Sequence, residues 1–425
     1  MKLELERQDF LKAWQTAGKF ANSKTPKESA GGILITAAED NSVILEATDL
    51  KTSIRCRAQG ANVLEAGFAV VPASMLGDML RKLEANDLIL EVNSERGLLN
   101  AGSNKMRFSV ISADEFPKIP ESSGAETVCE VPASILGKII AEGSSASSQP
   151  QDFPKYLGTC LLRTGQGAIM AVSTDGKRLS LSKYPCETTK EEDLLIPAPA
   201  LKELGKTITS NYGGENSVKI LSDGSTVWFA LNDIEFSIRR VESAFPKFER
   251  ILNDELKTTL RIQSGELSSA LDRIDIIAKT TPAHIMAMSL NPSDGEVIIT
   301  ARAPELGTAS ERLQANIEGE YLQLGFNVAF FQDGLKALGA GGALIEFSGE
   351  EGQTRMKRSE GDDFLYMLMP ARLTSQDTIT DEEMGDFRVN SETQELTEIQ
   401  EVQENQDNQE YQDNQQNQEN QENPF

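Results

Sequence analysis

Val70–Leu76, with the sequence VVPASML, decides the fold, because two similar segments follow it at nearly equal intervals. They are Leu195–Leu201 (LIPAPAL) and Gly325–Phe331 (GFNVAFF). The last residues of the three segments are 125 and 130 residues apart. A period this long exceeds the unit of a solenoid repeat. It predicts three copies of one domain.

Other landmarks keep nearly the same spacing. They are Phe10, Ile135 and Leu267 in helix-like segments, the pairs Thr48-Asp49 and Thr174-Asp175, and Phe116–Lys118 with Phe245–Lys247. A chain of 425 residues has room for about three domains of roughly 150 residues. We therefore expect domains at residues 1–125, 126–255 and 256–373, and a C-terminal tail at residues 374–425.

Each copy mixes the two secondary-structure periods. Apolar residues recur every three or four positions in two predicted helices: Phe10, Trp14, Ala17 and Ala21 in the first copy, and Leu267, Leu271, Ile274 and Ile277 in the third. Pro72 and Pro197 stand where the second helix of their copy begins. Short alternating stretches at 43–46, 169–173, 218–221 and 297–300 predict strands, and Asp175-Gly176 predicts a hairpin turn. The pattern indicates an α+β domain with two helices against an antiparallel sheet, three times over.

The acidic charge is concentrated at one end of the chain. Asp and Glu outnumber Lys and Arg by 66 to 41, a net charge of −25, which argues against a simple basic nucleic-acid binder. Residues 374–425 carry 15 acids and one arginine, and 15 of the last 26 residues are Gln or Asn. Such a segment buries too little apolar surface to offset its ordering entropy. We expect a disordered, solubilising tail.

Few residues are suited to catalysis or metal binding. His284 is the only histidine, and the four cysteines contain no CxxC pair. Gly339–Gly342 lacks the lysine of a phosphate loop and is interpreted as a helix-to-strand loop. Carboxylates are abundant, but no pair stands out as acid and base. The start of the chain has no apolar signal core, and no stretch approaches the ~20 apolar residues that span a bilayer. We expect a cytoplasmic protein with reduced thiols, no metal, no cofactor and no membrane partner.

Basic side chains fall on the predicted helices. They are Lys12, Lys19, Arg81, Lys82, Lys138, Lys202, Lys206, Arg273, Lys279 and Lys336. Acids such as Asp78, Asp272, Asp275 and Asp333 lie close to them in sequence. On the residues alone, a mixed solvated face and a nucleic-acid face both remain open.

Four motifs resemble those of the bacterial sliding clamp family, the beta subunit of DNA polymerase III. They are Thr174–Leu179 (TDGKRL), Phe245–Ile251 (FPKFERI), Gly325–Val328 (GFNV) and Tyr366–Leu373 (YMLMPARL). The resemblance covers residues 1–373 in order, the triplication included. The tail lies outside it.

The resemblance implies a ring-shaped homodimer and no active site. Helices would line the central hole and sheets the outer surface. The ring would encircle double-stranded DNA without reading its sequence and tether the polymerase catalytic subunit, with the clamp loader and other clamp-motif proteins as further partners. It adds Lys24, Gln151 and Lys155 to the DNA-facing residues, and it places Phe108, Ile276 and Ile277 at the dimer interface.

The resemblance also implies a pocket for a short peptide motif. Its lining would be Leu157, Thr174, Gly176, Lys177, Arg178, Leu179, Pro246, Arg250, Ile251, Met367, Leu368, Met369, Pro370 and Arg372. For each apolar member, ordinary core packing is the alternative. Two positions depart from the family pattern, because Lys177 stands where many members have histidine and Ala371 where many have methionine.

Two other functions compete with the clamp. A three-domain adaptor would bind peptides without encircling DNA, and a hydrolase would use a pair of carboxylates. The tail, with its charge of −14, is expected either to screen Arg178 and Arg372 or to compete weakly for the pocket.

Overall fold

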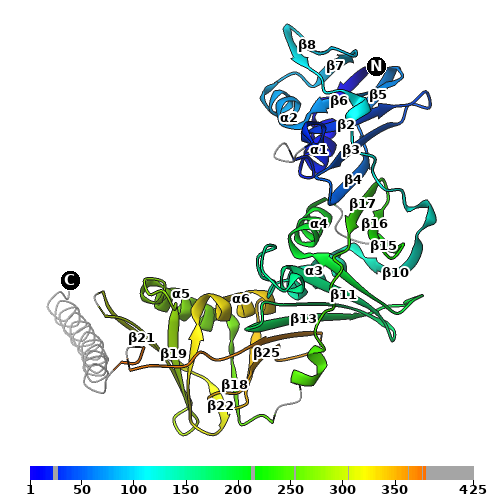
Figure 1. Ribbon diagram of the computed structural model, residues 1–425. Helices are drawn as coiled ribbons and strands as arrows, with labels where there is room; N and C mark the ends of the chain where they lie inside the picture. Colours follow the sequence, from blue (N-terminus) through cyan, green and yellow to red (C-terminus); the bar gives the residue numbers. More distant parts are fainter. Residues whose placement is uncertain are drawn as a thin grey trace, which may run out of the picture. The chain divides into compact units, whose positions relative to one another are not determined.

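The computed structural model describes residues 1–22, 27–211, 216–252, 255–304, 306–361, 363–375 and 377–379 (Figure 1). Lys24 and residues 380–425 of the predicted tail lie outside the described part. Contacts divide the chain into two units. The first contains residues 1–254, 333–339 and 355–368, and the second contains residues 255–332, 340–354 and 369 onward.

The first copy of the repeat alternates short strands with two helices. Its elements are β1 (Lys2–Glu6), α1 (Arg7–Gly18), η1 (Glu28–Gly31), β2 (Gly32–Ala37), β3 (Val43–Thr48), β4 (Thr52–Arg57), β5 (Ala61–Glu65), β6 (Gly67–Pro72), α2 (Ala73–Lys82), β7 (Asp87–Val92), β8 (Arg96–Ala101), β9 (Asn104–Ser109), η2 (Ala113–Glu115) and η3 (Ser122–Gly124).

The second copy follows the same order. Its elements are β10 (Glu126–Pro132), α3 (Ala133–Gly143), η4 (Lys155–Gly158), β11 (Thr159–Gly165), β12 (Ala168–Thr174), β13 (Arg178–Pro185), β14 (Glu192–Pro197), α4 (Ala198–Asn211), β15 (Ser217–Ser222), β16 (Thr226–Leu231), β17 (Ile234–Arg239) and η5 (Phe248–Leu252).

The third copy completes the series. Its elements are β18 (Thr258–Gln263), α5 (Ser264–Ala278), β19 (Ile285–Asn291), β20 (Glu296–Ala303), β21 (Gly307–Gln314), β22 (Asn316–Gly319), β23 (Leu322–Asn327), α6 (Val328–Leu338), β24 (Gly342–Phe347), β25 (Thr354–Arg358) and β26 (Phe364–Leu368). Six α-helices and antiparallel strands in the described residues confirm the predicted α+β class.

The predicted apolar stripes form the helix–sheet core. Phe10, Trp14 and Ala17 of α1 are buried, as are Leu267, Leu271 and Ile274 of α5, whereas Ile277 is half-exposed. The indole Nε1 of Trp14 donates to the carbonyl of Ala73 (2.9 Å), which fixes α1 against the start of α2. Figure 1 shows the corresponding helices α3 and α4 of the second copy packed side by side.

Strand pairing joins neighbouring copies within the first unit. One sheet runs β5-β1-β7-β8-β9, and a second runs β10-β15-β16-β17-β4-β3-β2-β6. In the second sheet β17 pairs with β4 of the first copy, from Ile234 opposite Cys56 to Ile238 opposite Thr52. In the same way β26 pairs with β13. In the second unit, a sheet of order β21-β20-β19-β23 packs against α5.

Three of the four cysteine thiols are buried. All four cysteines are free, and burial raises the pKa of Cys56, of Cys129 and of Cys160 to about 12. The thiolate is the reactive form, so a raised pKa lowers its fraction at any pH below 12. We expect these three thiols to resist Ellman's reagent at pH 8 until denaturant unfolds the protein. Rapid labelling of all three in the native protein would contradict the buried placement.

Candidate partner-binding and DNA-facing sites

The β12–β13 hairpin forms the turn that the sequence predicts at Asp175-Gly176. Gly176 adopts a φ of +86°, a left-handed conformation that costs glycine little. The hydroxyl of Thr174 accepts from the Gly176 N–H (3.1 Å) and donates to the Arg178 carbonyl (2.6 Å). The Asp175 carboxylate accepts from the backbone N–H groups of Lys177 (2.9 Å) and Arg178 (3.0 Å). The turn therefore has a fixed shape and leaves the Lys177 side chain exposed.

Arg178 is buried at the base of this turn. Its guanidinium donates to Asp175 (2.8 Å), Asp333 (2.6 Å) and the Tyr366 hydroxyl (3.0 Å), all within the first unit. Burial alone would lower the pKa of Arg178, but Tyr366 and the two carboxylates outweigh it and raise the pKa. The side chain is therefore held in one position by residues of the chain itself.

The residues predicted to line the peptide pocket divide by exposure. In the first unit Leu179 and Met367 belong to a buried cluster with Phe248, and Leu368 and Thr174 are also buried. Leu157 is half-buried, and the exposed members of this unit are Gly176, Lys177, Pro246, Arg250 and Ile251. In the second unit Met369 and Arg372 are exposed and Pro370 is half-buried. Exposed apolar side chains at Ile251 and Met369, 45% and 43% accessible, are suited to contact a partner.

Ala371 holds the last segment of the second unit to β23. Its N–H donates to the carbonyl of Gly325 (2.8 Å) in an isolated bridge. A Cβ at Gly325 would lie 2.5 Å from the Ala371 carbonyl oxygen, so this position requires glycine. The backbone at Ala371, one of the two departures from the family pattern, is thus fixed by the sheet.

About half of the predicted DNA-facing cations already have acidic partners. Lys12 binds Asp9 (2.9 Å), Lys19 lies 3.4 Å from Glu203, Arg81 binds Asp78, Lys138 binds Asp363 (2.7 Å) and Arg273 binds Glu311 (2.7 Å). Lys202 donates to Ser147 (2.9 Å), and burial lowers its pKa. Gln151 and Lys155 are exposed between α3 and β11. Among the described residues, no ion pair is formed by Lys82, Lys155, Lys206, Lys279 or Lys336, which leaves these five charges available.

Grooves follow the helix pairs of the first two copies. The α3–α4 groove, about 400 Å³, contains Lys202 and Lys206 beside Gly137 and Gly205. The α1–α2 groove, about 460 Å³, contains Lys19 and Arg81. Small residues at the crossings let each helix pair approach closely, which puts the cations along shallow channels.

The predicted dimer residues lie on two elements. Phe108, on β9, is only 6% exposed, because its ring covers Gly97 on the neighbouring strand β8. Ile276 is 58% exposed on α5, and its neighbour Ile277 is half-buried.

Sequence reasoning missed a basic stripe that consists of Arg96, Lys105 and Arg107. Alternate residues of a strand face opposite sides of the sheet. Arg96 pairs with Ser109, Leu98 with Arg107, and Asn100 with Lys105, so the three cations share one face, opposite the buried Leu99 and Phe108. All three are exposed, and in the described part of the chain Lys105 and Arg107 have no acidic partner. The alternation of Lys105 and Arg107 was the available signal.

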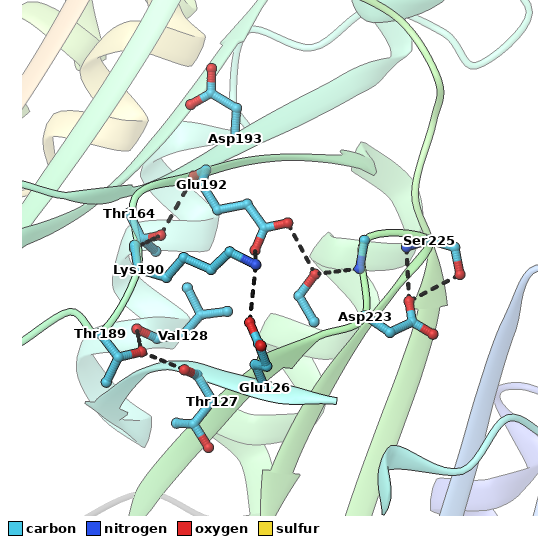
Figure 2. Close-up of polar contacts among 12 residues, drawn as sticks. Glu126, Thr127, Val128, Thr164, Thr189, Lys190, Glu192, Asp193, Asp223 and Ser225 are labelled. Atoms are coloured by element: carbon cyan, nitrogen blue, oxygen red, sulfur yellow. Dashed lines mark hydrogen bonds and ion pairs between the residues drawn. The ribbon is translucent and has the colours of Figure 1, made fainter. Parts of the chain in front are cut away.

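The adjacent acids Glu192 and Asp193 both form ion pairs with basic side chains. Figure 2 shows Lys190 between Glu126 (3.2 Å) and Glu192 (3.9 Å), and Ser222 also donates to Glu192 (3.2 Å). Arg240 donates to the same carboxylate (3.0 Å). Asp193 accepts two hydrogen bonds from Arg163 (2.7 and 3.0 Å). These acids therefore serve in ion pairs that border a hollow of about 580 Å³ on this sheet.

Other possible sites have structural explanations. Nε2 of His284 contacts the carboxylate of Asp275 on α5. In the described residues no three His, Cys, Asp or Glu side chains form a cluster that could hold a metal ion. None of the helices described there combines the length and apolar character of a bilayer-spanning segment.

Comparisons with known proteins cover all three copies. Three family models of the DNA polymerase III beta subunit match in order: the N-terminal domain at residues 1–120, the central domain at 130–247 and the C-terminal domain at 249–372. The beta sliding clamp of Staphylococcus aureus is 26% identical over 382 residues, which cover 88% of this chain and 99% of that protein. That of Staphylococcus epidermidis is also 26% identical, over 383 residues, with the same coverage.

Solved structures agree on the fold. The sliding clamp of Bacillus subtilis superposes with a TM-score of 0.82 at 22% identity, over 88% of this chain and 100% of that one. The beta subunit of Pseudomonas aeruginosa does so with a TM-score of 0.81 at 24% identity and the same coverage. With its three domains matched in order and its relatives matched almost end to end, the chain belongs to the DNA polymerase III beta subunit family, the beta sliding clamps.

Proposed function

We propose that two copies of this chain close into a ring around duplex DNA and tether the DNA polymerase III catalytic subunit for processive replication. A beta sliding clamp is a non-catalytic processivity factor, and the chain acts as one. The clamp loader and other proteins with a clamp-binding motif are its further proposed partners.

The pattern of free strand edges carries the proposal. Each copy ends in an equivalent strand: β9, β17 or β26. Strand β17 pairs with β4, and β26 pairs with β13, each the third strand after the first helix of its copy. In the described sheets β9 is left as an edge, and so is β21, the equivalent of β4 and β13.

A second chain can pair with both of these edges. Pairing β9 of each chain with β21 of the other repeats the two junctions already present within one chain and closes a two-fold dimer of six domains. Exposed edges also invite unwanted pairing, so their mutual coverage would protect the protein from aggregation. The proposed interface positions Phe108, on β9, and Ile276 and Ile277, on the helix packed against β21, belong to these edges.

A ring also reconciles the acidic chain with a DNA partner. Contacts with phosphates weaken as salt rises, and a ring needs few of them because DNA leaves only when the ring opens. Such contacts would come from the predicted DNA-facing cations that have no acidic partner among the described residues: Lys82, Lys155, Lys206, Lys279 and Lys336. The net charge of −25 would discourage adsorption of DNA elsewhere on the surface.

The test is retention on DNA of different topology. The mass in solution should equal two chains, and protein loaded on nicked circular DNA should remain bound until the circle is cut. A monomer that is never retained on circles would overturn the proposal. It would favour the three-domain peptide adaptor, which binds peptides without loader-dependent retention.

A separate prediction concerns the peptide pocket. Replacing Met369 with alanine, or Ile251 with aspartate, should weaken the binding of a fluorescent clamp-motif peptide by about tenfold or more, because each change removes an exposed apolar contact of about 1.5–3 kcal/mol. Fluorescence anisotropy measures the affinity. Leu306→Ala, which truncates another exposed apolar side chain of the second unit, is the control and should leave it unchanged. If all variants bind the peptide with equal affinity, Met369 and Ile251 do not line the pocket.

A further inference from the structure

Residues 380–425 are strongly acidic. They contain 14 Asp or Glu and one Arg. The segment also lies beyond the matched relatives, whose family models end at residue 372. Two features bear on its function: its own negative charge and the position of Thr378, just before it begins.

Residues 371–379 run from β23 to β20, the neighbour of the free edge strand β21. After the bridge between Ala371 and Gly325 on β23, the chain reaches β20, where Arg302 donates to the carbonyl of Thr378 (3.3 Å). Arg302 faces the opposite side of the sheet from the buried residues Val297, Ile299 and Ala301, which alternate with it along the strand. Strand β20 pairs with β21. Thr378, two residues before the acidic segment begins, thus lies one strand away from the edge that would meet β9 of the other chain.

The basic stripe lies on β9 and on its neighbour β8. Arg96, Lys105 and Arg107 all occupy the face of their sheet that is opposite the buried Phe108. Strand β21 offers them little, because its one carboxylate, Glu311, already binds Arg273 (2.7 Å). Three cations would therefore enter the proposed interface without acidic partners from β21.

We propose that the acidic segment of each chain, residues 380–425, binds the basic stripe Arg96, Lys105 and Arg107 of the other chain and strengthens the dimer. This inference rests on the proposed dimer. Reach is not limiting, because an extended chain spans roughly 3.3 Å per residue. The contacts are exposed ion pairs, so they weaken as ionic strength rises.

The direction in which truncation changes the dimer dissociation constant distinguishes this proposal from simple charge repulsion between the two chains. Removing residues 380–425 reduces the net negative charge of each chain from −25 to −12, and weaker repulsion between the two chains should by itself tighten the dimer at low salt. Binding to the stripe predicts the opposite. In sedimentation experiments, truncation after Ile379 should raise the dimer dissociation constant about tenfold at about 50 mM salt, with little change at about 500 mM.

Charge variants locate the contact. The variant Lys105→Gln with Arg107→Gln should loosen the full-length dimer about as much as truncation does, and it should have little effect on the truncated dimer. Lys51→Gln with Lys118→Gln is the matched control, since it removes two exposed cations elsewhere in the first copy. A truncation that tightens the dimer, or leaves it unchanged at low salt, overturns the proposal. So does a stripe variant that is equally harmful with and without the tail.

A binding experiment with a peptide distinguishes failure of the tail proposal from failure of the proposed dimer. A labelled peptide of residues 380–425 should bind the truncated chain at low salt, and the two stripe substitutions should abolish that binding. If the chain is monomeric throughout, the proposed ring fails whatever the peptide does. If the dimer forms but the peptide ignores the stripe, only the tail inference fails.

Discussion

Ile276→Asp is expected to convert the dimer into monomers and to abolish retention on circular DNA. Ile276 is 58% exposed on α5, which packs on β20 and on the free edge strand β21. An isolated chain tolerates a carboxylate at an exposed position. In a closed interface the same carboxylate would be buried without a partner, which costs several kcal/mol for an ionised group. Because the proposed ring would have two equivalent interfaces, the dimer would bear that cost twice.

Sedimentation and retention on nicked circles measure the two consequences of Ile276→Asp. The dimer dissociation constant should rise at least a hundredfold, since each 1.4 kcal/mol is a factor of ten. The control is Leu64→Asp, a similar exposed aliphatic residue on β5, at the edge of the first sheet opposite β9. It should leave both measurements unchanged. If Ile276→Asp remains a dimer, α5 does not contribute to the interface.

Local patterns allowed much of the fold to be predicted from the sequence. The repeat, the α+β class and the hairpin turn at Asp175-Gly176 depend on spacing, apolar periodicity and glycine conformation, which are properties of short segments. The core stripe of α5 was confirmed at Leu267, Leu271 and Ile274, whereas Ile277 is only half-buried. The buried face of α5 continues at Ala278 instead, four residues after Ile274, and a spacing of three or four residues allows either position.

The charged surface could not be predicted in the same way. Lys138 appeared as an open cation on a helix, but it binds Asp363, 225 residues away. Arg273 binds Glu311, 38 residues away. Such pairs form because strands and helices from distant segments meet in the fold. Leu179 and Met367, two pocket residues of the resemblance, are likewise brought together from distant segments, and they lie in one buried cluster.

Glu142→Ala is expected to lower the free energy of unfolding by about 1–3 kcal/mol, because Arg358 loses one of its two carboxylate partners and the buried Ser182 hydroxyl loses its acceptor. Glu142 closes α3, and its side chain is only 7% exposed. Its carboxylate accepts from the Ser182 hydroxyl (2.6 Å) and from Arg358, which also binds Asp363 (3.1 Å). Denaturant unfolding, monitored by tryptophan fluorescence, measures the loss.

A double variant distinguishes a lost ion pair from a lost contact. Replacing both charges, as Glu142→Leu with Arg358→Met, removes the cation together with its carboxylate and leaves Asp363 paired with Lys138 (2.7 Å). It should recover most of the stability, since apolar pairs of similar volume often equal a buried ion pair. Glu130→Ala, an exposed glutamate of β10, is the control and should change stability by no more than about 0.5 kcal/mol. A cost below about 1 kcal/mol for Glu142→Ala would mean that Asp363 and water compensate Arg358 fully once Glu142 is gone. The network that ties α3 to β13 and β25 would then position these elements without stabilising them.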